Sequence, residues 1–435
     1  MRFTAVLVVV SLIAAACAAD NPQQTDDPPS TAPGTVAGML VASDLDRLDP
    51  SAPSADVERV TAGLAKFAAD LYEQLADDGN MVFSPVSVYT ALAMAYAGAA
   101  GSTADEMAEL LAGDVERDEF QAAMNVLDQA LESRNRSASE FEGAVELSVA
   151  NSLWGQDGMA FEQAFLDALA TNYGSGMRIV DFIDGAAREE ARLAINAWVA
   201  GETNDRIEDL IAAGVLDAMV RLVLVNAVYL NAAWAAPFEE AATADQPFTL
   251  LNGDEVSVPM MRQAGTLPYV DGEGWQAIRI PYAGNELGMV VILPDQGSFE
   301  QVEASLADGF LDGVSRALSS NAVELSLPKF EIRTQIGLVP PLQSMGLREA
   351  TSTAADFSGM TGARDLFISD VVHEAWISAD EAGTEAAAAT AVIMSLTAAP
   401  QDPVLFSVDR PFIFVLQDIE TESILFMGRV VDPSS

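Results

Sequence analysis

Residues 380–397 constrain the fold of this chain more than any other segment, because one of their two faces is small or apolar and carries no charge. Taken at every second position, that face consists of Thr384, Ala386, Ala388, Thr390, Val392, Met394 and Leu396. Successive side chains of a strand point to opposite sides of a sheet, so this face could enter a sheet that is buried on both sides. Four consecutive alanines, 386–389, also suit a helix, since alanine has the highest helix propensity. The segment alone leaves a central strand, an exposed loop and an alanine-rich helix open.

The rest of the chain predicts a mixture of helices and apolar strands. Apolar residues at helical spacing predict helices at 57–77, 87–98, 103–111, 116–133 and 188–200, with Ser102 or Thr103 placed to cap the third. Apolar or alternating runs predict strands at 145–153, 221–230, 277–281, 288–293, 323–327, 405–406, 412–417 and 423–428. Long helices mixed with such strands indicate an α+β fold with helices packed on large sheets.

The N-terminal region differs in composition from the rest. Arg2 is followed by an apolar run at 5–16, too short to span a bilayer, and then by the only cysteine, Cys17. Residues 1–17 therefore fit a signal peptide. Their end resembles a bacterial lipoprotein signal, which implies lipidation of Cys17 and a cell-surface protein, with plain secretion as the alternative. Residues 18–58 are rich in Pro, Ser, Thr and Asp and are expected to be a disordered linker to a folded domain at 59–435.

The charge of the chain excludes some classes of partner. The net charge is −44, from 65 acidic and 21 basic residues, and the only lysines are Lys66 and Lys329. Nucleic acids and heparin-like polyanions need clustered cations, so neither is expected to bind. The acidity is interpreted as a solvated surface, with attraction to basic proteases as the alternative. The sequence shows no Cys/His cluster, so no metal or cofactor is expected.

An enzymatic reading has little support in the residues. Ser326-Leu327-Pro328-Lys329 matches the S-x-x-K pattern of serine acyl-transferases, but there the pattern starts a helix, which Pro328 would disrupt. His373 is the only histidine, and no G-x-S-x-G motif is present. We therefore expect no catalytic residues.

Seven stretches of the chain carry recognisable motifs, at 80–107, 196–207, 224–238, 327–330, 381–389, 406–414 and 426–433. In their residues and in their order they resemble the serpin family, inhibitors that trap serine proteases by changing conformation. One departure is Asn231-Ala232, where the family usually has Lys-Gly. The resemblance spans roughly residues 59 to 435. It implies a single domain with three β-sheets, about eight or nine helices and an exposed reactive-centre loop.

The resemblance also assigns roles to individual residues. The loop's hinge corresponds to Glu381, Gly383, Thr384, Glu385, Ala386, Ala387, Ala388, Ala389 and Thr390. Family spacing places the bond that a protease cuts between Thr397 and Ala398, with Leu396 as the alternative. Ser84, Ser87, Asn196 and His373 correspond to the family's "shutter" beneath the sheet, with His373 bonded to Asn196. Glu381 corresponds to an ion-pairing residue at the top of the sheet.

The implied mechanism is that of a suicide substrate. A protease cuts the loop, the upstream part inserts into the central sheet, and the acyl-linked protease is trapped. Small residues before the bond suggest an elastase-like or subtilisin-like target, and Leu396 a chymotrypsin-like one. The implied partner of a monomeric chain is thus a serine protease held in a covalent acyl complex, with a cysteine protease as an alternative. A non-inhibitory serpin that acts as a binding or substrate-like protein is the rival function.

Overall fold

A computed structural model describes residues 38–136, 144–307, 309–384 and 403–435. Its α-helices are α1 (Ser54–Leu75), α2 (Pro85–Tyr96), α3 (Gly101–Leu111), α4 (Arg117–Glu132), α5 (Gln163–Tyr173), α6 (Gly185–Glu202), α7 (Phe299–Glu303), α8 (Phe310–Ala317), α9 (Val339–Ser344) and α10 (Ser358–Thr361). None of the helices in these ranges has the length and apolar composition needed to cross a bilayer. The expected signal peptide at 1–17, with Cys17, lies outside the described residues.

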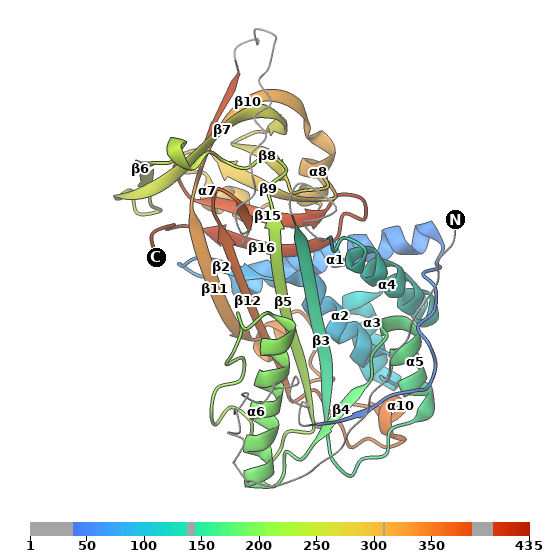
Figure 1. Ribbon diagram of the computed structural model, residues 1–435. Coiled ribbons are helices and arrows are strands. Elements are labelled where there is room, and N and C mark those ends of the chain that lie inside the picture. The colour runs from blue at the N-terminus through green and yellow to red at the C-terminus, as the bar shows by residue number, and fades with distance from the viewer. Residues whose placement is uncertain (1–37, 137–143, 308, 385–402) are drawn as a thin grey trace, which may run out of the picture. The chain divides into compact units, whose positions relative to one another are not determined.

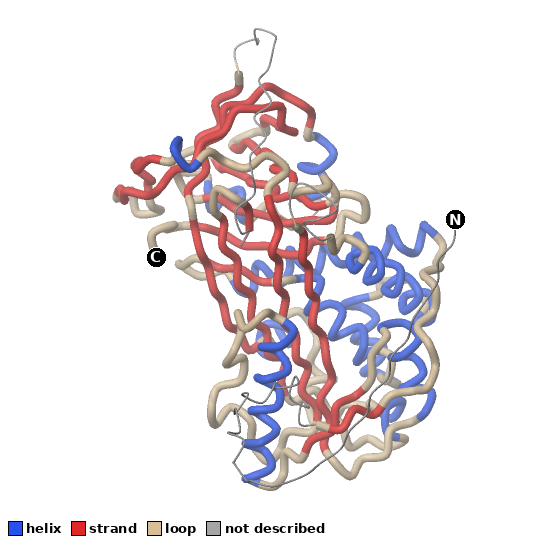
Figure 2. Tube along the Cα trace, in the orientation of Figure 1, coloured by secondary structure: helices blue, strands red, loops and turns tan. Residues whose placement is uncertain are grey.

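Seven strands form a long sheet in the order β1-β4-β3-β5-β13-β12-β11. They are β1 (Met39–Val41), β3 (Val145–Gln156), β4 (Met177–Val180), β5 (Leu222–Ala233), β11 (Phe330–Gly337), β12 (Asp370–Ala379) and β13 (Gly383–Thr384). Figures 1 and 2 show the long strands β3, β5, β12 and β11 side by side, with α6 lying across one face. Because the sheet is covered on both faces, β5 is almost wholly apolar.

Nine strands form the second sheet, ordered β14-β10-β7-β8-β9-β15-β16-β2, with β6 paired to β7. They are β2 (Met81–Phe83), β6 (Ala244–Thr249), β7 (Glu255–Asp271), β8 (Trp275–Pro281), β9 (Leu287–Pro294), β10 (Ser319–Pro328), β14 (Val404–Ser407), β15 (Phe412–Asp418) and β16 (Ile424–Val430). β7 pairs with β8 at only three positions. These three pairs join the strands β14, β10, β7 and β6 to the strands β8, β9, β15, β16 and β2. The three sheets that were expected are therefore hydrogen-bonded as two.

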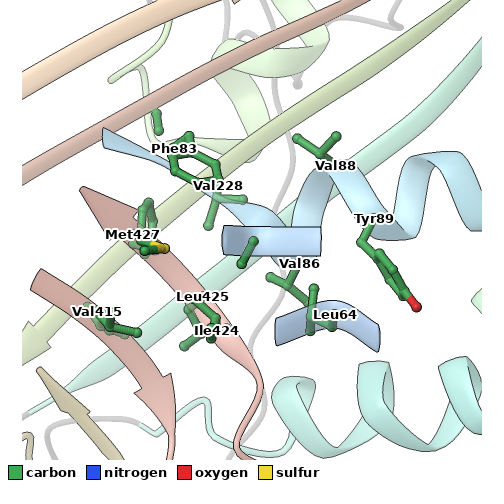
Figure 3. Packing of buried hydrophobic residues seen from close by; sticks show 14 of the residues in the cluster. Leu64, Phe83, Val86, Val88, Tyr89, Val228, Val415, Ile424, Leu425 and Met427 are labelled. Atoms are coloured by element: carbon green, nitrogen blue, oxygen red, sulfur yellow. The ribbon is translucent and has the colours of Figure 1, made fainter. Parts of the chain in front are cut away.

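The alternation of side chains along β5 divides the core between two helices. Leu224 and Val228 belong to the cluster that includes α2, whereas Val223 and Val225 belong to the cluster that includes α6. Figure 3 shows the first cluster, where Val228 lies near Phe83 of β2 and Val86 of α2. All twelve residues of α2 are buried, which fits a helix that is apolar all round. The helix begins where Ser84 Oγ accepts a hydrogen bond from the Ser87 N–H, a normal N-cap contact.

Three local expectations need correction. The linker was expected to run to residue 58, but β1 and the first turns of α1 are ordered within that range. Neither Ser102 nor Thr103 caps α3; the helix begins after Ala100, and both hydroxyls donate to Glu349 instead. Ten α-helices are found in the described ranges where eight or nine were expected, and α7, α9 and α10 have only four to six residues.

Candidate functional site

A two-residue strand separates the upper ends of β5 and β12. Gly383 and Thr384 form β13, which pairs antiparallel with Ala233 and Ala232 of β5 and, through Thr384, with Ala379 of β12. A Cβ atom on Gly383 would lie only 2.1 Å from the carbonyl oxygen of Ala232, so this position accepts only glycine. The expected hinge thus begins inside the sheet, in an extended conformation.

Below β13 the two long strands pair with each other directly. β5 and β12 run parallel, and their ladder extends from Asp370↔Val223 to Ala375↔Val228. Above that point, residues 229–231 of β5 and 376–378 of β12 no longer pair with each other. Each strand keeps its outer partner, β3 for β5 and β11 for β12. The sheet is therefore closed in its lower part and split in its upper part.

Thr384 is bonded to one buried aromatic side chain, which in turn stacks on a second. Its Oγ1 shares a hydrogen bond of 2.6 Å with the hydroxyl of Tyr282, whose ring stacks on Trp234 at a centroid distance of 4.5 Å. Burial raises the pKa of Tyr282, so the phenol stays protonated. Trp234 Nε1–H donates to the carbonyl oxygen of Asp380 at 2.9 Å, and the Trp234 backbone N–H donates to Ala382. Thr384 is therefore buried with its hydroxyl bonded to a neutral phenol, and a charged side chain at this position would have to be buried as well.

Glu381 anchors the segment to the neighbouring sheet. Lys329, which follows β10, donates to its Oε2 at 2.7 Å, and Thr243 Oγ1–H donates to its Oε1 at 2.7 Å. Burial alone would raise the pKa of Glu381, but these two hydrogen bonds hold it below the usual value. The carboxylate is therefore ionised at neutral pH and fixes the chain immediately before β13.

His373 joins the closed part of the sheet to the start of α2. Its Nε2 accepts a hydrogen bond from the Ser84 N–H at 3.0 Å, so its Nδ1 carries the proton and donates to Asn226 Oδ1 at 2.9 Å. The side chain is fully buried, and burial lowers the pKa of His373 to about 3. The neutral ring therefore bridges β12, β5 and the N-terminus of α2.

A family model described as Serpin (serine protease inhibitor) matches residues 62–433. The chain belongs to the serpin family. It is 38% identical over 439 residues to an uncharacterized serpin-like protein of Thermococcus kodakarensis, an alignment that covers 100% of this chain and 99% of that protein. It is 35% identical over 390 residues to the leukocyte elastase inhibitor of Bos taurus, covering 87% of this chain and 100% of the inhibitor.

The fold agrees with that assignment. The crystal structure of the thermophilic serpin Tengpin in its native state is similar to this chain, with a TM-score of 0.79, 28% identity, and coverage of 89% of this chain and 97% of Tengpin. As a member of a family of protease inhibitors, this serpin is not an enzyme. The S-x-x-K residues accordingly lie in β10 and just after it, where Ser326 pairs with Arg262 and Lys329 bonds to Glu381.

One of the expected shutter contacts is wrong. Asn196 lies on α6, on the other side of the serpin's long sheet from α2, and its side chain bonds to the backbone of Ile211 at 2.8 and 3.0 Å. The partner of His373 is Asn226, because the parallel register places these two residues opposite each other. Ser84 contacts His373 through its backbone, whereas Ser87 Oγ–H donates to Asn151 Oδ1. Asn226 is a single polar residue in the apolar run 221–230, and a buried polar side chain normally has a hydrogen-bond partner. The sequence therefore held a signal for this contact.

The remaining predicted site residues lie outside the described residues. They are Glu385, Ala386, Ala387, Ala388, Ala389 and Thr390 of the hinge, and Leu396, Thr397 and Ala398 around the expected reactive bond. Two contact residues, Tyr282 and Thr243, were not predicted, because their partners are more than 100 positions away in the sequence.

Proposed function

We propose that this serpin inhibits serine proteases as a suicide substrate and traps the acyl-enzyme by inserting the cleaved loop between β5 and β12. The observation that carries the proposal is β13, which already lies between these strands and runs antiparallel to both. Chain that continued along the same line would make antiparallel ladders on both sides. It would replace one parallel ladder, a pairing that is slightly less stable per residue.

Insertion can supply a large free energy only if many residues take part. Each new backbone hydrogen bond contributes about 1 kcal/mol net, so roughly a dozen inserted residues are needed for a decisive gain. The alternating face that starts at Thr384 provides uncharged residues over that length. Its first member is already buried, with 1% of its surface exposed. A charged residue at this position would have to enter without a partner.

In the proposed reaction the protease's serine oxygen attacks the carbonyl carbon of Thr397 and forms an ester. The bond from that carbon to the nitrogen of Ala398 breaks, and this nitrogen takes up the proton that the serine hydroxyl gave to the protease's general base and leaves as a new amine. Water would then hydrolyse the ester unless insertion first distorts the protease. Leu396 is the alternative acyl residue. The small residues favour an elastase-like or subtilisin-like target, and relatives named leukocyte elastase inhibitors support the former.

Incubation with an elastase-like serine protease tests the proposal. We expect a complex that survives SDS and heating, together with a small C-terminal fragment whose first residue identifies the cleaved bond. Thr384→Arg should still be cleaved but should form at least tenfold less complex, since the arginine cannot be accommodated beside Tyr282. Thr384→Ser keeps the hydroxyl group and is the matched control.

Two results would contradict the proposal. If the wild-type chain is cleaved but never retains the protease, it is a substrate-like serpin. If Thr384→Arg traps protease as well as the wild type does, insertion at this position is not the mechanism.

A further inference from the structure

Three segments of the chain meet at the lower end of the long sheet. A single row of paired residues crosses the lower ends of β1, β4, β3 and β5: Met39, Ile179, Gly155 and Leu222. Just below this row the Gln156 side chain donates to Asp181 at 3.0 Å, and the Gln156 backbone N–H donates to the carbonyl oxygen of Arg221 at 3.0 Å. We call the segments that meet here the basal end: residues 38–41, 177–188 and 217–222.

The basal end carries an unusual share of the exposed apolar surface. Met39, Leu40, Ile183 and Met219 are 65, 57, 53 and 63% exposed, and they are four of the ten large apolar side chains that are exposed in the described residues. Ile183 and Met219 lie in the turns after β4 and before β5. Exposed apolar residues scattered singly are normal, but a group gathered at one end of a protein indicates a contact surface.

The basal end is also close to neutral in a strongly acidic protein. Its charged residues are Arg178, Arg188 and Arg221 with Asp181, Asp184 and Asp217. Asp157, which follows β3 nearby, adds one carboxylate. The whole chain has 65 acidic residues against 21 basic ones. Anionic lipids give a bilayer a negative surface, which repels carboxylates and attracts arginine, so a bilayer would repel this end less than the protein as a whole.

The chain enters the folded domain at this same end. β1 is the first strand of the domain, and Met39 already lies in the basal row. Cys17, which the sequence predicts to carry a lipid, precedes Met39 by 22 positions, and a chain of that length spans at most about 75 Å. A surface held within this distance of a bilayer needs only weak affinity to stay in contact, because the tether raises its effective concentration.

The hinge lies at the opposite end of the same strands. Gly383 pairs with Ala233, whereas Leu222 lies in the basal row, so the two levels are separated along β5 by about 36 Å at 3.3 Å per residue. Figure 1 shows β4 and the start of α6 at the bottom of the picture and β10 at the top. A domain that rests on its basal end therefore holds β13 away from the surface beneath it.

We propose that the basal end docks on the lipid bilayer that holds Cys17, with Met39, Ile183 and Met219 in contact with lipid. The hinge then faces the medium, so a protease that arrives from the medium meets the reactive loop before it meets the membrane. This inference rests on the predicted lipidation of Cys17, and its meaning for inhibition rests on the proposed function.

The test measures how the full-length protein is oriented on vesicles. The protein is expressed with its own N-terminus in a bacterial host, purified from the membrane fraction and reconstituted into vesicles of phosphatidylcholine and phosphatidylglycerol. Cys17 is the only cysteine and the lipid blocks its thiol, so Met219→Cys accepts a single fluorophore at the basal end. Leu405→Cys, at a β14 position that is 71% exposed, is the matched control in the other sheet. We expect lipids with spin-labelled headgroups to quench the fluorophore at position 219 at least threefold more than the one at position 405.

A charge at the basal end should weaken the contact with lipid. Ile183→Asp, added to Met219→Cys, should reduce the quenching at least twofold, because a carboxylate without a partner resists transfer to an apolar environment. Leu251→Asp is the matched control, since it places the same charge at another half-exposed apolar position, in the turn between β6 and β7. It should leave the quenching unchanged.

Three results would overturn the inference. Quenching at position 405 that equals or exceeds quenching at position 219 would mean that the domain does not rest on its basal end. A signal at position 219 that changes with protein density but not with the lipid quencher would mean that a second copy of the chain covers this end. Recovery of the protein outside the membrane fraction would remove the anchor. None of these measurements involves a protease, so the proposed inhibition stands or falls on its own test.

Discussion

His373 connects the closed part of the long sheet to α2, and its protonation would break that connection. A protonated ring would place a proton on Nε2, which now accepts the hydrogen bond of the Ser84 N–H. The pKa of His373 is lowered to about 3 by burial, so the folded protein resists this protonation far below neutral pH. The unfolded chain takes up the proton near the ordinary value of about 6.5. Folding therefore becomes less favourable in acid.

The pH dependence follows from the sign of that shift. A folded-state pKa below the unfolded value contributes stability above pH 6.5, and this stability is lost as the pH falls from 6.5 toward 3. Between pH 7 and pH 5 the loss is about 2 kcal/mol. The unfolding free energy of wild type minus that of His373→Gln should fall by this amount, because the carboxylates that also titrate are common to both proteins. A difference that stays constant over this range would contradict the assignment.

The sequence can indicate that a polar side chain is buried when that residue lies in an apolar run. It cannot identify the partner when the contact joins two segments that only the fold brings together. The resemblance to the family implies a buried role for His373 but gives Asn196 as its partner, and only the register of β12 against β5 identifies Asn226 as the partner. Asn226 stood out only as one polar residue in an apolar run. The bond between Thr384 and Tyr282 joins residues 102 positions apart, and no local pattern predicts it.

At the scale of elements, β13 depends on close contact between backbones. Gly383→Ala would place a methyl group against the carbonyl oxygen of Ala232, which is part of a paired strand and cannot move aside. Overpacking of this kind costs about 1–3 kcal/mol. We expect β13 to leave the sheet and the hinge to be cut faster by a nonspecific protease under native conditions. Gly337→Ala, at the end of β11 with open space around it, should leave the cleavage rate unchanged.

The predicted elements agree with the structure where burial is uniform or strictly periodic. α2 and β5 begin within two residues of their expected starts, since α2 is buried all round and β5 is apolar on both faces. β7 was not predicted, because Pro259, Gly265 and Pro268 interrupt its pattern, and pairing with β6, β10 and β8 imposes the strand. The linker predicted at 18–58 includes β1, because a strand of three residues is too short to show an alternating pattern in a segment rich in polar residues and proline.

The whole molecule has a net charge of −44, so a cation that lies between two elements can stabilise their contact by pairing with carboxylates. Arg134, just after α4, binds Asp418 at the end of β15; Arg47, before α1, binds Asp128 on α4; and Lys329 holds Glu381 next to β13. Self-repulsion of the remaining carboxylates destabilises any compact state. It acts on both the intact and the loop-inserted forms, since both are compact and contain the same residues. The gain in stability proposed for the inserted form comes from new strand pairing and burial.

Cleavage at the expected bond should therefore make the folded protein more stable, not less. Roughly ten new backbone hydrogen bonds at about 1 kcal/mol each would raise the unfolding midpoint by more than about 10 °C. Scanning calorimetry of intact and nicked protein measures this shift directly, and nicked Thr384→Arg provides a sample cut at the same bond whose insertion is blocked. The midpoint of that variant should rise far less, because insertion would bury a guanidinium beside Tyr282, where the wild type buries a small hydroxyl. Equal midpoints for intact and nicked wild type would mean that the cut loop makes no stabilising strand pairs between the upper parts of β5 and β12. The proposed function would then have to be abandoned.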